Sequence, residues 1–283
     1  MKIASFEQAG KQGYGVVIDD GIIFASDDFQ TRFPALRDVL EADALDQLGA
    51  DTQSRNVDAR IHSVQLLPPI TNPQRIFCVG INYPKKYPLD NPAPPPEHII
   101  LFAKLPGTLV GHGEALELPE GEAADTFDYE GEIGVVIGKA GRHIAEEDAL
   151  DFIAGYTVIN DGSVRGWQKH SIHAGKNFAN SGGCGPWMVT SDEITDLASM
   201  RLSTRLNGET VQDTTVAEMV FSIPQVIAYI SHTIDLRPGD LIATGSPEGA
   251  GGSRQPPRFL RAGDELEIEV SGVGILRNPV GQF

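Results

Sequence analysis

The sequence predicts an α+β protein in which β-strands dominate. After about residue 70, short apolar segments bounded by turn residues outnumber segments with helical periodicity. The last of these segments alternates Leu266, Ile268 and Val270 with acidic residues, as a strand with one buried face does. Strands that follow one another without regular helical crossovers favour a rolled or sandwiched sheet.

The composition is that of a soluble globular protein with a strongly acidic surface. Of 283 residues, 41% are apolar and 22% are charged, and the formal net charge is −17. This charge repels phosphate backbones, so nucleic acid is not an expected partner, whereas a local cation would still permit an anionic substrate. No apolar run approaches the roughly 18 residues of a membrane span, and the N-terminus lacks the long apolar region of a signal peptide. Cys78 and Cys184 have no paired spacing, which predicts free thiols and a cytoplasmic location.

The first 68 residues are expected to form a small α/β module. Pro34 suits a first helical turn, and the apolar stripe that follows predicts a helix over residues 34–48. The segment LPPITNP is expected to be a linker, so we place the main domain at residues 69–283. Strands of the module are expected at residues 2–6, 14–18 and 21–25.

The main domain begins with a buried strand, RIFCVGIN, and a proline-rich loop. Six prolines lie between Pro84 and Pro96, and proline continues neither a helix nor a sheet ladder. A loop of this length is typical of a lid over a site. Further strands are expected at 99–104, 129–137, 152–160 and 186–190, a hairpin at 203–213 and a helix at 222–234. A turn, strand and loop are expected over 238–249, and a last strand region over 262–276.

The stretch DYEGEIGVVIG places Asp128, Glu130 and Glu132 on one face of a strand, because side chains alternate with a period of two. Acids that alternate along a strand usually mark a solvated face, as in DELEIE at residues 264–269. Here the strand continues as an apolar run, which indicates burial, and buried carboxylates need a partner.

Asp161 follows the next apolar strand, and together with Glu130 and Glu132 it would form a site of oxygen ligands. Such ligands suit Mg²⁺ or Mn²⁺, with Ca²⁺ a further candidate in a crystal. The segment HSIH is not a zinc HExxH motif. The alternative for Asp161 is a turn or capping residue.

Three further features could contribute to such a site. Lys176 could stabilise an oxyanion, and Arg165 with Gln168 could bind a carboxylate. The loop at residues 243–252, which includes Thr244, could present hydroxyl and N–H groups to a ligand. The alternatives are a surface lysine, an exposed helix face and a plain turn.

Eight segments occur in one order and together resemble the fumarylacetoacetate hydrolase family over roughly residues 70 to 280. The segments are VGINY, DYEGEIGVVIG, FIAGYTVINDGSVRGWQ, GKNF, GPWMVTSDEI, LNGETVQD, PGDLIATGSPEGAG and GDELEIEVSGVGIL. The resemblance implies a mixed β-sandwich roll and a homodimer.

The resemblance also implies roles for individual residues. Metal ligands would be Glu130, Glu132 and Asp161, binding Mg²⁺ or Mn²⁺. The active-site lysine falls on Lys176, which with the ligand Glu132 is expected to be catalytic. Substrate contacts fall on Tyr83, Arg165, Gln168 and Thr244.

The expected activity is hydrolysis of a C–C bond in a small 2,4-diketo acid of the acylpyruvate or fumarylpyruvate type, through a metal-stabilised enolate. This chemistry belongs to the catabolism of aromatic compounds or sugar acids. The same metal site serves isomerases, decarboxylases and dehydratases acting on 2-keto acids, which is the alternative. A third hypothesis is a binding protein without catalysis.

The chain departs from the family pattern in the loop. Family hydrolases commonly place a histidine after the asparagine–tyrosine pair to activate water, whereas this sequence has Pro84, Lys85 and Lys86. His98 lies at the far end of the loop and is expected to be structural rather than catalytic. The identity of the proton acceptor is therefore open.

Overall fold

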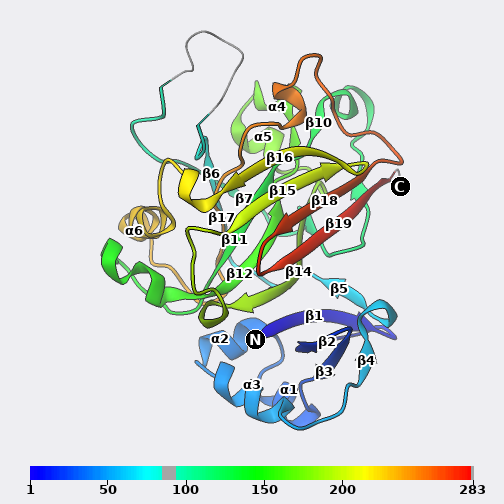
Figure 1. Ribbon diagram of the computed structural model, residues 1–283, viewed down its shortest axis with the longest axis vertical. Helices are drawn as coiled ribbons and strands as arrows, with labels where there is room; N and C mark the ends of the chain where they lie inside the picture. Colours follow the sequence, from blue (N-terminus) through cyan, green and yellow to red (C-terminus); the bar gives the residue numbers. More distant parts are fainter. Residues whose placement is uncertain (85–93, 282–283) are drawn as a thin grey trace.

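The N-terminal part is a small module of strands and helices at one end of the molecule (Figure 1). The computed structural model describes residues 1–84 and 94–281. The strands of this part are β1 (Lys2–Gln8), β2 (Lys11–Ile18), β3 (Gly21–Phe24), β4 (Ala59–Arg60) and β5 (Gln65–Leu67). Its helices are α1 (Asp27–Arg32), α2 (Leu36–Glu41) and α3 (Leu45–Thr52), followed by the 3₁₀ turn η1 (Ile61–Ser63).

The single helix predicted over residues 34–48 is wrong, because the structure has two helices there. Helix α2 ends at Glu41 and α3 begins at Leu45. Asp43 between them has a φ of 50°, a left-handed conformation that interrupts the helical hydrogen bonds. The predicted apolar stripe is nevertheless buried across both helices.

The main sheet joins the two parts, because β1 pairs with a central strand of the larger part. The central strands are β6 (Ile76–Gly80), β7 (Ile100–Lys104), β8 (Leu109–Val110), β11 (Gly131–Ile137), β12 (Ile153–Asn160), β14 (Gly182–Thr190) and β17 (Leu241–Ala243). The strand order is β4-β3-β2-β1-β14-β12-β11-β17-β6-β7, with β5 on β1 and β8 on β14. Strands of the N-terminal part therefore extend the sheet that carries the predicted metal ligands.

A second sheet packs over the central strands and closes the core. Its strands are β9 (Leu116–Glu117), β15 (Arg201–Leu206), β16 (Glu209–Thr215), β18 (Glu265–Val270) and β19 (Gly274–Gly281), in the order β16-β15-β18-β19-β9. Ile133 and Val135 of β11 and Leu202 and Ile268 of the second sheet belong to one buried apolar cluster. The predicted strand-dominated α+β fold with a sandwiched sheet is confirmed (Figure 1).

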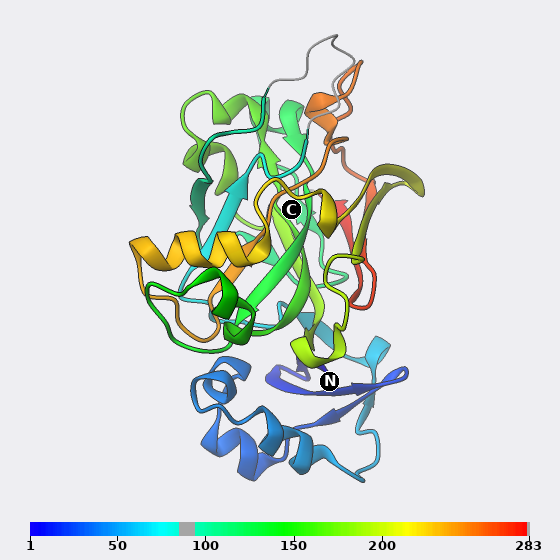
Figure 2. The same ribbon diagram turned by 60° about the vertical axis from the view of Figure 1, so that its left-hand side comes forward.

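Short elements surround the sheets. The largest of them, α6 (Ile223–Thr233), begins with a capping box between Ser222 and Gln225 and lies alongside η3 (Glu146–Phe152), as Figure 2 shows. No helix within residues 1–84 and 94–281 has the length and apolar character to cross a membrane. The remaining elements are β10 (Phe127–Asp128), β13 (Ser163–Val164), α4 (Arg165–Gln168), α5 (Ile172–Lys176), η2 (Gly121–Thr126), η4 (Ser191–Glu193), η5 (Val216–Glu218) and η6 (Gly251–Ser253).

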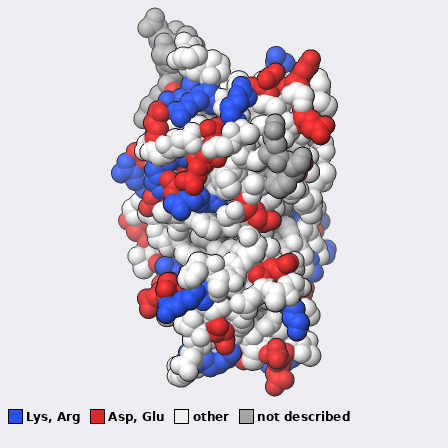
Figure 3. Space-filling view, turned by 90° about the vertical axis from the view of Figure 1, so that its right-hand side faces the viewer, with Lys and Arg blue, Asp and Glu red and all other residues white. Residues whose placement is uncertain are grey.

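Charges on the outside of the second sheet are paired across its strands. Arg205 contacts Glu269 at 2.9 Å, and Arg277 contacts Glu267 at 2.5 Å. Basic and acidic side chains are intermixed over the face of the molecule in Figure 3. Both cysteines are buried free thiols, as predicted, and burial raises the pKa of each.

Candidate metal centre

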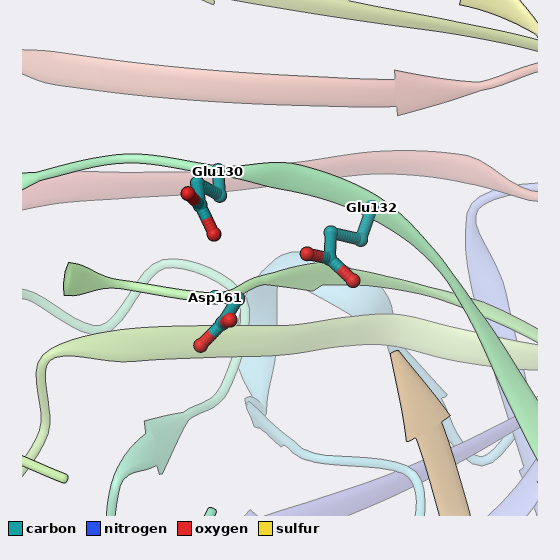
Figure 4. A group of neighbouring side chains, drawn as sticks. All are labelled: Glu130, Glu132 and Asp161. Carbon is teal, nitrogen blue, oxygen red and sulfur yellow. The ribbon is translucent and has the colours of Figure 1, made fainter. Parts of the chain in front are cut away.

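Two neighbouring strands bring three carboxylates together (Figure 4). Glu130 immediately precedes β11, Glu132 lies within it, and Asp161 immediately follows β12. The two strands are antiparallel, with Gly131 opposite Asn160, so the beginning of β11 lies beside the end of β12. The Asp161 N–H donates to the Glu130 carbonyl oxygen at 2.8 Å. One oxygen atom from each of the three carboxylates lies within 4.8 Å of the others.

Gly131 allows this strand to lie close to the second sheet. A Cβ atom at Gly131 would lie 2.2 Å from the Thr204 hydroxyl oxygen, so only glycine fits. The Gly131 N–H donates to Gln212 Oε1 at 3.0 Å, which fixes the strand there. The glutamate–glycine–glutamate sequence thus places two acids on one side of the strand. On the other side, Gly131 lets the backbone lie close to the second sheet.

The three carboxylates are removed from water. Glu132 exposes 1% of its surface and Asp161 none, while Glu130 is partly buried. The alternative of a solvated acidic face is therefore wrong for this strand. It holds for β18, where Glu265, Glu267 and Glu269 all keep exposed surface.

The surrounding charges shift the pKa values of the two glutamates in opposite directions. Burial opposes ionisation of Glu130, but Arg165 and Lys176 outweigh it and lower the pKa of Glu130 to about 2. Burial raises the pKa of Glu132 well above its ordinary value, and the negative charges of Asp161 and Glu130 raise it further. Lys176 lowers the pKa of Glu132 only in part, and Glu132 has no ion-pair partner among the described residues. A divalent cation between the three carboxylates would supply the missing positive charge, so the residues present fit a metal.

Arg165 and Lys176 approach the carboxylates directly. Arg165 Nη2 lies 2.7 Å from Glu130 Oε1. The Lys176 ammonium pairs with Glu130 Oε2 and lies 2.6 Å from Asp161 Oδ2. Only 4% of the Lys176 side chain is exposed, which contradicts the alternative of a surface lysine. Asp161 is likewise more than a turn residue, because its carboxylate belongs to this ion-pair network.

Asp128 is fully buried beside the site and holds two other parts of it. It accepts hydrogen bonds from Arg165 Nε at 2.7 Å and from the N–H groups of Gly251 and Gly252 at 2.7 and 2.9 Å. The carboxylate therefore orients Arg165 and anchors the loop after β17. Asp128 shares the face of the two glutamates but does not belong to the cluster of three.

Lys104 is a site residue that the sequence analysis missed. Its ammonium, at the end of β7, lies 2.9 Å from Asp161 Oδ1. The only signal in the sequence was a lysine at the end of an apolar strand, and such a residue is ordinarily a surface one. Lys104, Arg165 and Lys176 form ion pairs with Asp128, Glu130 and Asp161, whereas no ion pair with Glu132 is found among the described residues.

A cavity of about 480 Å³ opens onto the carboxylates. Glu130, Glu132, Lys176 and the predicted substrate residues Arg165 and Gln168 line it. Its other walls include the apolar side chains Ile81, Ile100, Phe102 and Ile172 and the polar residues Ser246, Glu248 and Ser253. The space is large enough for a small organic molecule.

Two predicted substrate residues are buried and do not line the cavity. The Thr244 hydroxyl is buried and donates to the Ile133 carbonyl oxygen at 2.9 Å, while Ser246 of the same loop lines the cavity. Tyr83 is 3% exposed, and its hydroxyl has no hydrogen-bond partner among the described residues. Burial and the nearby charge of Glu132 raise the pKa of Tyr83. A substrate contact by either residue stays a prediction.

Most of the predicted lid, residues 85–93, lies outside the described residues, so a proton acceptor there stays untested. His98 lines a separate surface pocket beside α6, together with Tyr229 and His232, which agrees with a structural role. Lys85 and Lys86 lie outside the described residues. Of the described residues that line the metal cavity, none is a histidine.

Comparison with known proteins identifies the class to which this fold and carboxylate cluster belong. The family profile described as fumarylacetoacetate (FAA) hydrolase C-terminal matches residues 75–281. The chain therefore belongs to the fumarylacetoacetate hydrolase family, as the resemblance implied.

Two relatives of the chain are named as oxaloacetate tautomerases. The chain is 36% identical over 272 residues to the mitochondrial oxaloacetate tautomerase fahd2 of Xenopus laevis, covering 93% of this chain and 83% of that protein. It is 39% identical over 225 residues to the oxaloacetate tautomerase YisK of Bacillus subtilis (strain 168), covering 78% and 74%.

Solved structures of similar proteins show the same fold over the whole chain. A putative HpcE protein from Mycobacterium smegmatis is 33% identical, with a TM-score of 0.86 and complete coverage of both chains. Maleylpyruvate hydrolase from Sphingobium sp. SYK-6 is 26% identical, with a TM-score of 0.84 and complete coverage of both. A structure of that hydrolase with manganese(II) and pyruvate has a TM-score of 0.80, 26% identity and coverage of 100% and 99%.

Proposed function

We propose that the chain is a divalent-metal-dependent tautomerase that interconverts the keto and enol forms of a small 2-oxo acid such as oxaloacetate. The observation that carries this proposal is one cavity lined by two carboxylates of the cluster, by Lys176 and by a further carboxylate, Glu248. The oxaloacetate tautomerases at 36% and 39% identity support it. The chemistry requires only a proton acceptor and a stabilised oxygen, without an activated water.

Glu130, Glu132 and Asp161 would hold Mg²⁺ or Mn²⁺ at their converging oxygens. When bound, such an ion supplies Lewis-acid charge beside the 2-oxo group and so favours the enolate. The manganese and pyruvate in the maleylpyruvate hydrolase structure agree with an oxygen-rich site of this kind.

Arg165 and Gln168 would orient the substrate carboxylate. They lie next to one another on the cavity wall, with Arg165 Nη1 3.3 Å from Gln168 Oε1, and Asp128 fixes the guanidinium from behind. A guanidinium and an amide match the geometry of a carboxylate. Lys176 would donate a hydrogen bond to the oxygen on which negative charge develops.

Glu248 is the proton acceptor that we propose. It is half-buried in the loop after β17, and no hydrogen bond or ion pair to it occurs among the described residues. Its oxygens are therefore free to take a proton, unlike those of Glu130. The C3–H bond of the substrate breaks as the proton moves to Glu248. The electron pair of the broken C3–H bond forms the C2–C3 double bond, and the carbonyl π pair moves to the oxygen near Lys176. A proton from solvent then adds to that oxygen to give the enol, and Glu248 releases its proton to solvent.

Hydrolysis of a C–C bond in a 2,4-diketo acid is the second candidate, as the sequence analysis expected. The specific support is the fold shared with maleylpyruvate hydrolase over the whole chain. Glu248 would then accept a proton from water, and Lys176 would stabilise the same enolate oxygen.

The two reactions are separated by their products. Purified protein is given Mn²⁺ or Mg²⁺ and either freshly dissolved oxaloacetate or a 2,4-diketo acid such as maleylpyruvate. A tautomerase accelerates the approach of enol absorbance to equilibrium without releasing CO₂ or pyruvate, whereas a hydrolase releases two acids from the diketo acid. Absence of tautomerisation in the presence of diketo-acid cleavage would replace the first proposal by the second. No reaction with either substrate class would contradict both.

A further inference from the structure

The Lys104 side chain is completely buried at the end of β7, beneath the carboxylate cluster. Its ammonium lies 2.9 Å from Asp161 Oδ1, although the angles do not make that contact a regular hydrogen bond. It donates to the carbonyl oxygens of Gly162, at 3.1 Å, and of Lys176. An ammonium has three N–H donors; these hydrogen bonds use two of them, and the third side of the ammonium faces Asp161 as an ion pair. Because the side chain is also buried and does not line the cavity, Lys104 is not placed to contact a ligand there.

The two lysines that contact Asp161 differ in access. Lys176 lines the cavity and its ammonium lies between Asp161 Oδ2 and Glu130 Oε2, both from predicted metal ligands. A cation bound by these oxygens would take over that charge, which frees Lys176 for the substrate. Lys104 does not line the cavity, and its contact is with the other oxygen, Oδ1. Its charge therefore stays on Asp161 whatever the cavity holds.

Lys104 also ties together three segments that are far apart in the sequence. Its contacts join β7 to the turn after β12 and to the C-terminal end of α5. The next residue makes a second connection between the same segments: the Leu105 N–H donates to Asn177 Oδ1 at 2.6 Å. The position of Asp161 relative to Lys176 thus depends on the end of β7.

We infer that Lys104 is a positioning residue of the metal centre, which holds Asp161 by Oδ1 so that Oδ2 faces Glu130. The inference rests on the proposed metal site. Groups behind metal ligands fix their orientation, and their loss typically lowers metal affinity about 10- to 100-fold. A buried lysine needs strong compensation, and here the compensation is Asp161 with two carbonyl oxygens.

The sign of the effect distinguishes positioning from simple electrostatics. Removing a positive charge near a cation site would, by Coulomb attraction alone, strengthen binding of the cation. If Lys104 instead positions Asp161, its removal weakens binding, because the carboxylate loses its orientation. A weaker Mn²⁺ complex in a neutral variant therefore identifies the positioning role.

The test compares Lys104→Met with Arg75→Met as a matched control. Arg75, whose side chain is 19% exposed, pairs with the buried Asp240, with Nη2 2.6 Å from Oδ2, at the other end of β6 and β17 from the carboxylate cluster. Both variants lose an ion pair to a buried aspartate, so both should have a lower melting temperature. Free Mn²⁺ measured by electron paramagnetic resonance should show Mn²⁺ binding weakened about 10- to 100-fold in Lys104→Met. Mn²⁺ binding should be unchanged in Arg75→Met.

Two further measurements complete the test. Lys104→Gln keeps a donor for the Gly162 carbonyl oxygen and serves if the methionine variant does not fold. At saturating Mn²⁺, kcat of the Lys104 variants should recover, because Lys104 touches no substrate. Folded Lys104 variants that bind Mn²⁺ as tightly as the wild type, or more tightly, would overturn the inference. Absence of Mn²⁺ binding by the wild type would instead overturn the proposed metal site and the inference with it.

Discussion

Arg165 bridges Asp128 and Glu130, with Nε 2.7 Å from Asp128 Oδ2 and Nη2 2.7 Å from Glu130 Oε1. Asp128, which does not belong to the cluster, thus orients the Arg165 guanidinium toward Glu130, which does. Because Asp128 also anchors Gly251 and Gly252, the strand that carries the acids and the loop that closes the cavity are joined at one side chain.

Asp128→Asn should therefore weaken substrate binding more than metal binding. A hydrogen bond to a charged group contributes about 1.5 to 3 kcal/mol, so KM for the 2-oxo acid should rise by roughly one to two orders of magnitude. Steady-state kinetics at saturating Mn²⁺ measures this. Asp213→Asn is the control, because Asp213 pairs with Arg201 at the surface and should leave KM unchanged. An unchanged KM in Asp128→Asn would show that Arg165 does not need this partner.

Glu132→Gln should abolish activity and lower Mn²⁺ affinity by more than the roughly 10- to 100-fold typical of outer-shell changes. The amide oxygen still accepts the Gly245 N–H, which donates to Glu132 Oε2 at 2.7 Å. The variant also removes a negative charge that Asp161 and Glu130 disfavour. Without metal it should melt no lower than the metal-free wild type, in calorimetry with a chelator present. Full activity of this variant without added metal would place the catalytic site elsewhere.

Lys176→Met should lower kcat by about 10²- to 10³-fold, the effect of removing one donor to a developing oxyanion. Lys169→Met is the matched control, because Lys169 is exposed in the same region and should have wild-type kinetics. Saturation with Mn²⁺ should not restore kcat in Lys176→Met, since the lysine itself contacts the reacting oxygen. Restoration by excess metal would mean that Lys176 acts only on the metal ligands.

Glu248→Gln should lower kcat by about 10²- to 10⁴-fold, the contribution of a general base. Glu248→Asp keeps the carboxylate and should retain part of the activity. Binding of Mn²⁺ and of pyruvate, measured by calorimetry, should match the wild type in both variants. A wild-type kcat in Glu248→Gln would assign proton transfer to another residue.

His112 should make the fold less stable in mild acid. Burial lowers the pKa of His112 below 6.5, and the nearby Arg277 lowers it further, against a hydrogen bond with the Ile275 backbone. The unfolded chain binds the His112 proton more tightly than the folded chain does. The contribution of neutral His112 to the free energy of unfolding is therefore complete above pH 6.5 and is lost as pH falls through the folded-state pKa. Urea unfolding of the wild type and of His112→Asn between about pH 7.5 and pH 5 measures this. The wild type should lose more stability than the variant, whereas His170→Asn, at an exposed residue, should follow the wild type. Parallel pH dependence of wild type and His112→Asn would refute this role.

Local patterns in the sequence were sufficient for the strand-dominated fold and for the two glutamates. The period of two in DYEGE places Glu130 and Glu132 on one face, and the apolar run after them predicts burial. These features depend only on backbone geometry and on the removal of apolar side chains from water. Both leave a pattern in residues that are neighbours in the sequence. The break at Asp43 between α2 and α3 shows the limit, since the same apolar stripe suits one helix or two.

Only the tertiary structure decided which partner each charged group has. Lys104 meets Asp161 because the end of β7 lies under the end of β12, and Asp128 turns to Arg165 and Gly251 rather than to the cluster. The Thr244 hydroxyl likewise turns to Ile133. Such pairs join segments tens of residues apart, and strand register and packing set their distances, so no local pattern encodes them. The sequence by itself determined which acids are buried, and the packing of distant strands determined which cations reach them.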